Sequence, residues 1–330
     1  MGWIQRSIDA GGESRNSLTD VEAGLFVDIG DRRAKLSQFW VLLTLSSLIA
    51  AGGVISDSTP AVIGAMIIAP LATPIYGVAL ATVIGSGARL RTATLLLLGG
   101  TVLNILLGAM VGLITFDRTP LDANPQIVGR TSPTLLDLGV AVVTGVAGSF
   151  ALARRDVSNI LAGVAIAISL VPVLAVVGIT AGAGRFDLAG GALSLFGANV
   201  AAILIAGVLV FGAAGYARAA VGRDPRVARR ARLLVAAVVL VVLVPLSLDS
   251  LRTWRYEHWQ RATSDATTAW IAGTPWQLDS VQLRGGDIII TVRGTDSGPP
   301  IEDLRESVRR SVPDHINVEL VQENGTTTGL

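Results

Sequence analysis

The sequence predicts an all-α polytopic membrane protein with about seven transmembrane helices and a small α/β domain at its C-terminal end. Of its 330 residues, 51% are hydrophobic and only 15% are charged, and the mean hydropathy is +0.60. Soluble domains carry about a quarter charged residues. The apolar residues also gather in runs of about 20, the length that crosses about 30 Å of hydrocarbon. We therefore expect the bilayer to surround most of the chain.

Seven apolar runs are long enough to be transmembrane helices. Residues 1–35, which precede them, are polar and lack the basic start of a signal peptide. If this segment is cytoplasmic, the segments on its side of the membrane hold fifteen basic residues, against three in the loops that join the spans on the other side. The positive-inside rule therefore predicts a plasma (inner) membrane protein with a cytoplasmic N-terminus and an extracytoplasmic C-terminus. The predicted spans are 36–55, 60–85, 90–116, 134–153, 157–181, 188–216 and 232–248. The long spans 90–116 and 188–216 could each instead be two short re-entrant pieces.

The second and fifth predicted spans resemble each other. Each starts near an acidic residue and a serine, continues through a glycine and small apolar residues, and holds a proline deep in the span. Because three spans separate the copies, they cross the membrane in opposite directions, which predicts an inverted repeat of residues 36–116 and 134–216, with 232–248 as an added helix. The matching positions are Asp57, Ser58, Pro70 and Pro74 in the second span, and Asp156, Ser158, Ser169 and Pro172 in the fifth.

The prolines predict breaks in both helices near the middle of the membrane. Proline removes a backbone donor and clashes with the preceding turn. Broken backbone is tolerated in a membrane where it lines a cavity or is covered by protein, so both a central polar site and a simple repaired kink are open interpretations.

Two asparagines in the third and sixth spans are the main polar candidates beside these breaks. Asn104 and Asn199 each follow a glycine closely. A buried amide seeks hydrogen-bond partners, so each asparagine either binds a ligand or joins neighbouring helices. The candidate ligand-binding residues are Asn104, Asn199, Thr73, Thr101, Ser169, Pro70, Pro74 and Pro172, and the polar residues at helix ends are Asp57, Ser58, Asp156 and Ser158.

Several functional classes are poorly supported by the composition. The chain has no cysteine, and its two histidines lack the spacing of metal ligands. No charged residue falls near the middle of a predicted span, and the acidic residues at span ends are interpreted as helix caps. With no nucleotide loop or nucleophile motif either, we expect no enzyme, cofactor, metal site or nucleic-acid partner. A small neutral solute, or an anion held by helix N-termini, fits the remaining polar groups. Membrane lipid is an expected partner, and a homo-oligomer is left open.

The composition changes after the seventh span, where tryptophans and charged residues become frequent. Aromatic residues of this kind gather at membrane interfaces. Strands are predicted at 278–283, 288–293 and 316–321 and a helix at 301–312, with Gly-Gly as a hairpin signal. Residues 251–330 are therefore predicted to form an extracytoplasmic α/β domain, and a short amphipathic helix is predicted at 18–27, against the inner leaflet.

The motif around the first break resembles a known family. Residues 56–74 read Ser-Asp-Ser-Thr-Pro-Ala-Val-Ile-Gly-Ala-Met-Ile-Ile-Ala-Pro-Leu-Ala-Thr-Pro, and Asp-Val-Ser-Asn-Ile-Leu-Ala-Gly at 156–163 and Ser-Leu-Val-Pro at 169–172 accompany it. Together they resemble the bacterial uncharacterised hydrophobic domain family, domain of unknown function 389, over residues 37–248. The resemblance implies the membrane architecture and leaves the function open.

Two functions are consistent with these patterns. The first is a transporter or channel-like permease with a site at the paired breaks. The second is a membrane-anchored sensor or scaffold that acts through the C-terminal domain.

Overall fold

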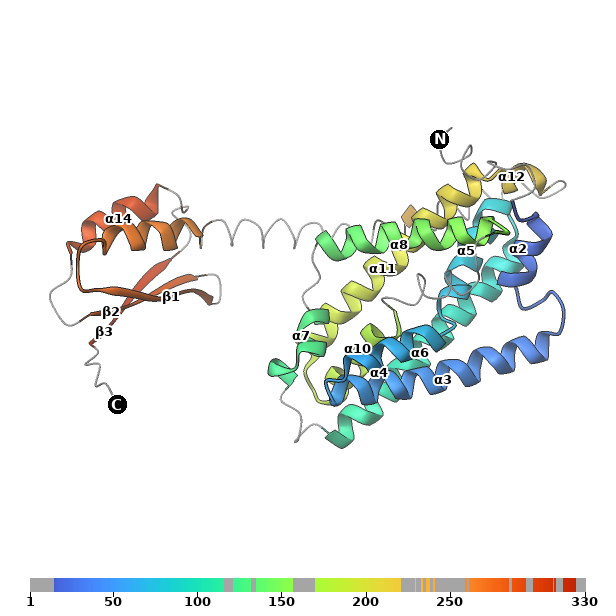
Figure 1. Ribbon diagram of the computed structural model, residues 1–330, viewed down its shortest axis with the longest axis horizontal. Coiled ribbons are helices and arrows are strands. Elements are labelled where there is room, and N and C mark those ends of the chain that lie inside the picture. Colours follow the sequence, from blue (N-terminus) through green and yellow to red (C-terminus); the bar gives the residue numbers. More distant parts are fainter. Residues whose placement is uncertain are drawn as a thin grey trace. The chain divides into compact units, whose positions relative to one another are not determined.

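The chain divides into two compact units, Met1–Leu246 and Ser247–Leu330 (Figure 1). This computed structural model describes residues 15–115, 121–131, 135–156, 170–220, 261–284, 287–294, 299–310, 312 and 317–324, together with 229, 233, 236, 237, 240 and 259.

The first unit is helical throughout its described part. Its first half holds α2 (Leu18–Leu25), α3 (Arg32–Ile55), α4 (Thr59–Ile68), α5 (Ala72–Ile84) and α6 (Gly87–Thr115). Its second half holds η1 (Leu121–Ala123), α7 (Pro125–Thr131), α8 (Leu135–Ala153), α10 (Val171–Gly182), α11 (Phe186–Ala213) and α12 (Tyr216–Ala219).

Within the described residues, four helices, α3, α6, α8 and α11, are long and apolar enough to cross a membrane. They coincide with the first, third, fourth and sixth predicted spans. The second predicted span is the pair α4 and α5, which bends by 43° at a short break and makes a fifth candidate. The chain is therefore a membrane-spanning protein. The second part of the fifth predicted span is α10, whereas its first part, 157–169, and most of the seventh, 232–248, lie outside the described residues.

Among the described helices of this unit, α6 and α10 make the most extensive contact. Four glycines line it, Gly108 and Gly112 on α6 and Gly178 and Gly182 on α10, and a Cβ at any of them would press into the backbone of the facing helix. Small residues at this spacing let membrane helices approach closely. In the same way α5 packs on α11, where a Cβ at Gly207 would lie 2.8 Å from the Cβ of Ala79.

The turns after α5 and after α10 have the same construction. Each contains a glycine with positive φ, which glycine adopts without steric cost. Each also closes with a backbone hydrogen bond that spans five residues. The glycines are Gly85 (φ 70°) and Gly184 (φ 78°), and the hydrogen bonds run from Ser86 N–H to Ala81 (3.0 Å) and from Arg185 N–H to Thr180 (2.8 Å).

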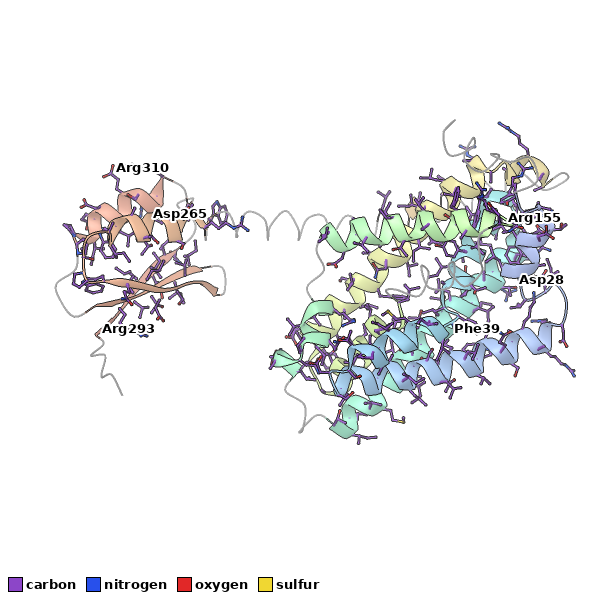
Figure 2. All side chains as sticks on the ribbon, in the orientation of Figure 1. Asp28, Phe39, Arg155, Asp265, Arg293 and Arg310 are labelled. Carbon is purple, nitrogen blue, oxygen red and sulfur yellow. The ribbon has the colours of Figure 1, made fainter. Side chains whose placement is uncertain are left out.

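The helix predicted at 18–27 is α2, and it packs on protein. Helix α2 lies beside α5 (Figure 1). Its Val21 and Leu25 are buried, and the Arg89 guanidinium contacts Glu22 at 2.7 Å. Figure 2 shows Arg155 and Asp28 at this same end of the unit. Arg155 pairs with Asp20 on α2 at 2.8 Å. Helix α2 therefore covers one end of the helical unit, and we call this the α2 end.

The second unit is a small α/β fold, as predicted. Strand β1 (Gln277–Arg284) pairs antiparallel with β2 (Asp287–Gly294), and β2 pairs in parallel with β3 (Val318–Asn324). Helix α14 (Ile301–Arg309) connects β2 to β3, and a further helix covers residues 261–270. The core joins Ile288, Ile290 and Val292 of β2 to Leu304 and Val308 of α14. This alternation along β2 is the pattern of a sheet with one buried face.

Candidate functional site

Asn104 is the most unusual polar residue of the helical unit. Its side chain is fully buried in α6, and neither its amide nitrogen nor its amide oxygen has a hydrogen-bond partner in the described structure. A buried polar group without a partner costs about 1–3 kcal/mol. Such a group in a membrane helix needs a ligand, a water molecule or a functional reason.

The contact between α6 and α10 places Asn104 at the start of α10. A Cβ at Gly108 would lie 2.7 Å from the carbonyl oxygen of Ala175, and Gly112 repeats this contact one turn further along both helices. The two helices therefore run parallel and in register. One turn before Gly108 is Asn104, and one turn before Ala175 is Val171, the first residue of α10.

The start of α5 lies near the same point of α6. A Cβ at Gly100 would lie 2.9 Å from Cδ1 of Leu71, the residue that precedes α5. Gly100 is one turn, or about 6 Å, before Asn104 on the same face of α6. Asn104 therefore lies between Gly100, which faces the residue before α5, and Gly108, which faces the second turn of α10.

Asn199 has a similar position relative to α5. Its side chain is only 2% exposed. Gly207 of α11 faces Ala79 of α5. Asn199 lies two turns before Gly207, and Leu71 lies two turns before Ala79. This pairing of the two helices puts Asn199 at the level of Leu71. Each asparagine is therefore level with the start of the interrupted helix from the other predicted repeat.

Two of the three predicted prolines lie in the first turns of helices, and the third lies in the break between α4 and α5. Pro70 lies in the break between α4 and α5, Pro74 is in the first turn of α5, and Pro172 is in the first turn of α10. Proline is tolerated in a first turn because its missing N–H has no intrahelical partner there. The expected kink at Pro74 is thus a helix start, and neither α5 nor α10 has a side-chain hydrogen bond at its N-cap.

The other predicted residues are spread over different environments. The Thr101 hydroxyl donates to the Leu97 carbonyl of its own helix at 2.8 Å, and Thr73 is exposed. Three of the remaining positions lie at helix ends. Ser58 caps α4, Asp57 has a positive φ of 49°, and Asp156 pairs with Arg154. Ser158 and Ser169 lie outside the described residues.

Two asparagines outside the predicted set hold the ends of the unit together. Asn16, just before α2, donates to the Leu152 carbonyl at the end of α8 (2.9 Å). Asn124, just before α7, donates to the Val54 carbonyl at the end of α3 (2.8 Å). We call the end covered by α7 the α7 end. Sequence patterns alone could not show these contacts, because each joins residues more than 60 positions apart.

The charged residues of the described spans lie toward the helix ends. Arg89 contacts Glu22 and Asp28 at the α2 end, and Arg185 contacts Asp122 (2.7 Å) at the α7 end. The described residues hold no group of three or more histidine or acidic side chains that could bind a metal ion. The polar groups around Asn104 are thus backbone amides and uncharged side chains.

Comparison with known proteins agrees with the motif around the first break. Residues 66–205 match the family model described as Domain of unknown function (DUF389). The resemblance to this family is confirmed. The DUF389 region includes the second part of α4, all of α5, α6, α8 and α10, and most of α11. It therefore contains α5, α10 and both asparagines.

One relative of this chain is an uncharacterised protein of Methanocaldococcus jannaschii. It is 33% identical over 175 residues, which cover 53% of this chain and 53% of the relative. The chain thus spans about half the length of that protein in the match. No solved structure matches the chain.

Proposed function

We propose that this protein is a membrane transporter or channel-like permease for a small neutral solute or anion, with its site where α5 and α10 begin. The observation that carries the proposal is the fully buried amide of Asn104, which lies near these helix starts and has no hydrogen-bond partner among the described residues. Transporters of several folds bind their substrates at interrupted helices near the membrane centre.

Matched contacts support the inverted repeat on which this proposal rests. Helix α10 packs on α6, and α5 packs on α11, so each interrupted helix contacts the second long helix of the other repeat. The turns at Gly85 and Gly184 have the same hydrogen bonds.

The short helices extend this match beyond the predicted repeats. Each of α2 and α7 precedes the first long helix of a repeat, and the asparagine before it bonds to the end of the other repeat's first long helix. An arginine at the start of the second long helix also pairs with acidic residues that precede the first long helix. Arg89 of α6 pairs with residues before α3, and Arg185, at the start of α11, pairs with a residue before α8. The repeat unit we propose is therefore a short helix, a long helix, an interrupted helix and a second long helix.

With two further membrane spans, the helical unit would have the topology that the charge pattern predicts. Residues 157–169 would provide the first part of the fifth span, and 232–248 the seventh span. The α2 end would then face the cytoplasm, because it carries most of the basic residues, and residues 251–330 would be extracytoplasmic.

Flux measurements test this function. Purified protein in liposomes should carry at least one member of a broad solute library, and Asn104→Ala and Asn199→Ala should abolish that flux. Thr92→Val is the matched control, because Thr92 lies on α6 near its start and its hydroxyl bonds to Ala88 of its own helix (3.1 Å). If no solute moves faster than through protein-free liposomes, the proposal is wrong.

A groove in the second unit favours the alternative of a sensor or scaffold. It lies between α14 and the parallel strands β2 and β3, has a volume of about 540 Å³ and combines apolar with charged walls. Its lining includes Ile290, Leu304, Val308, Arg305 and Glu319. A chain that ends after residue 250 separates the two functions, since a transporter should keep its flux and a sensor should lose its response.

A further inference from the structure

We infer that the ligand of the Asn104 site is a small anion, such as a halide, an oxyanion or a short carboxylate, held by the N-terminal ends of α10 and α5 and by the Asn104 amide. This inference rests on the proposed function and narrows its substrate class.

The starts of α10 and α5 are the first of these groups. The first N–H groups of a helix have no intrahelical partner, and the aligned peptide dipoles place about half a positive charge there. Pro74 and Pro172 carry no N–H, and the Thr73 N–H donates to the Pro70 carbonyl (3.2 Å), but neither start has a side-chain cap for its remaining donors. The N-cap residues Leu71 and Leu170 are at most 2% exposed, so bulk water does not reach them freely.

The Asn104 amide is an independent observation at the same place. Its register against α10 puts it level with Val171, and its nitrogen offers two donors that no described residue accepts. A helix with free N–H groups and a neighbouring unpaired donor is a ready site for negative charge.

The charges around the site favour an anion over a neutral solute. A neutral solute gains little from two helix ends of the same sign, whereas an anion is attracted by both, and more strongly in a water-poor site. The described carboxylates of the helical unit, such as Glu22, Asp137 and Asp187, lie near helix ends, where they would not repel an anion at the centre.

A dehydrated cation is the main competing ligand. The C-terminal end of α4 lies at the same break, and Pro70 has no N–H to pair with the Met66 carbonyl. One carbonyl end does not replace the six to eight oxygens, usually including carboxylates, that a calcium ion takes. The experiment therefore includes cation and neutral-solute arms.

Thermal stability of the full-length protein in detergent tests the inference. At constant ionic strength, sodium gluconate is replaced by sodium chloride, nitrate, formate, sulfate or phosphate. One or more of these anions should raise the unfolding midpoint of the wild type by about 3–6 °C at ten times its dissociation constant. The rise should disappear in Asn104→Leu and persist in Thr92→Val.

The other arms separate the possible failures. Choline replaces sodium with gluconate held constant, and glycerol and urea serve as neutral probes. If a cation or a neutral probe stabilises the wild type and Thr92→Val but not Asn104→Leu, the anion inference is overturned and the transport site stands. If no compound distinguishes the wild type from Asn104→Leu, both the inference and the proposed site are overturned.

Discussion

At the scale of single residues, the two buried asparagines Asn104 and Asn124 have opposite roles. Asn124 donates to the Val54 carbonyl (2.8 Å) and accepts from the Gln126 N–H (2.9 Å), so its side chain stabilises the fold. The Asn104 amide makes no such bond within the described structure. A structural residue and a ligand-binding residue should therefore respond differently to the same substitution.

Asn104→Leu should stabilise the protein in the absence of ligand. It removes an unsatisfied buried amide, which is worth about 1–3 kcal/mol. Asn124→Leu is the matched control and should destabilise by a similar amount, because it leaves the Val54 carbonyl and the helix start without partners. Thermal unfolding in detergent measures both changes. A loss of stability in Asn104→Leu as large as that in Asn124→Leu would mean that Asn104 stabilises the fold through hydrogen bonds to neighbouring helices.

At the scale of the elements, the contact between α6 and α10 sets the position of the site. Gly178→Ala should destabilise the helical unit by about 1–3 kcal/mol, because the new Cβ would collide with the Ile105 carbonyl. Gly190→Ala on α11 is the control. A Cβ there meets nothing within 4 Å, so helix propensity should make this change neutral or slightly stabilising. Equal effects of the two substitutions would argue against the close contact.

The attachment of α2 should depend on pH in the acid range. Hydrogen bonds from the Ser17 hydroxyl and from the Arg155 guanidinium hold the pKa of Asp20 below its ordinary value of 3.8. A lowered pKa in the folded protein contributes stability that is present above 3.8 and is lost as the pH falls through the folded-state pKa. Asp20→Asn should therefore lower the unfolding midpoint at pH 7 and have a shrinking effect below pH 3.8.

Asp122→Asn provides a comparison at the α7 end. The Arg185 guanidinium lowers the pKa of Asp122 in the same way, so its effect should fade over the same pH range. An effect of Asp20→Asn that stays constant down to pH 2.5 would contradict the charge pairing with Arg155, since an uncharged contact does not titrate.

At the scale of the whole molecule, hydropathy predicted the long helices well because a membrane span requires about 20 apolar residues. The alternation of apolar residues around Ile288–Ile290 likewise predicted the small sheet. The break in the second span was predicted correctly and lies at Pro70, whereas Pro74 and Pro172 lie in the first turns of helices, since a proline that bends a helix and one that starts a helix look alike in sequence. The contacts of α2 and α7 depend on single polar side chains and distant backbone carbonyls, which leave no periodic signal.

The two asparagines also show the limit of motif matching. When the two predicted repeats are aligned at Gly85 and Gly184, the two asparagines do not coincide. Asn104 lies one helical turn further along α6 than Asn199 lies along α11. The short glycine-asparagine motifs suggested equivalent positions. The structure shows instead that each asparagine is level with the start of an interrupted helix, a relation that only the packing of α6 on α10 and of α11 on α5 reveals.

Cysteine accessibility at position 104 tests the central claim most directly, and the natural chain has no cysteine to interfere. Asn104→Cys in liposomes should react with a small water-soluble methanethiosulfonate, because a transport site must open to water. Leu106→Cys on the same helix is 61% exposed on the apolar outer surface and should stay unreactive. If Asn104→Cys is as unreactive as Leu106→Cys while a cysteine at the exposed Asp122 is labelled, water does not reach the centre and the transport site is contradicted.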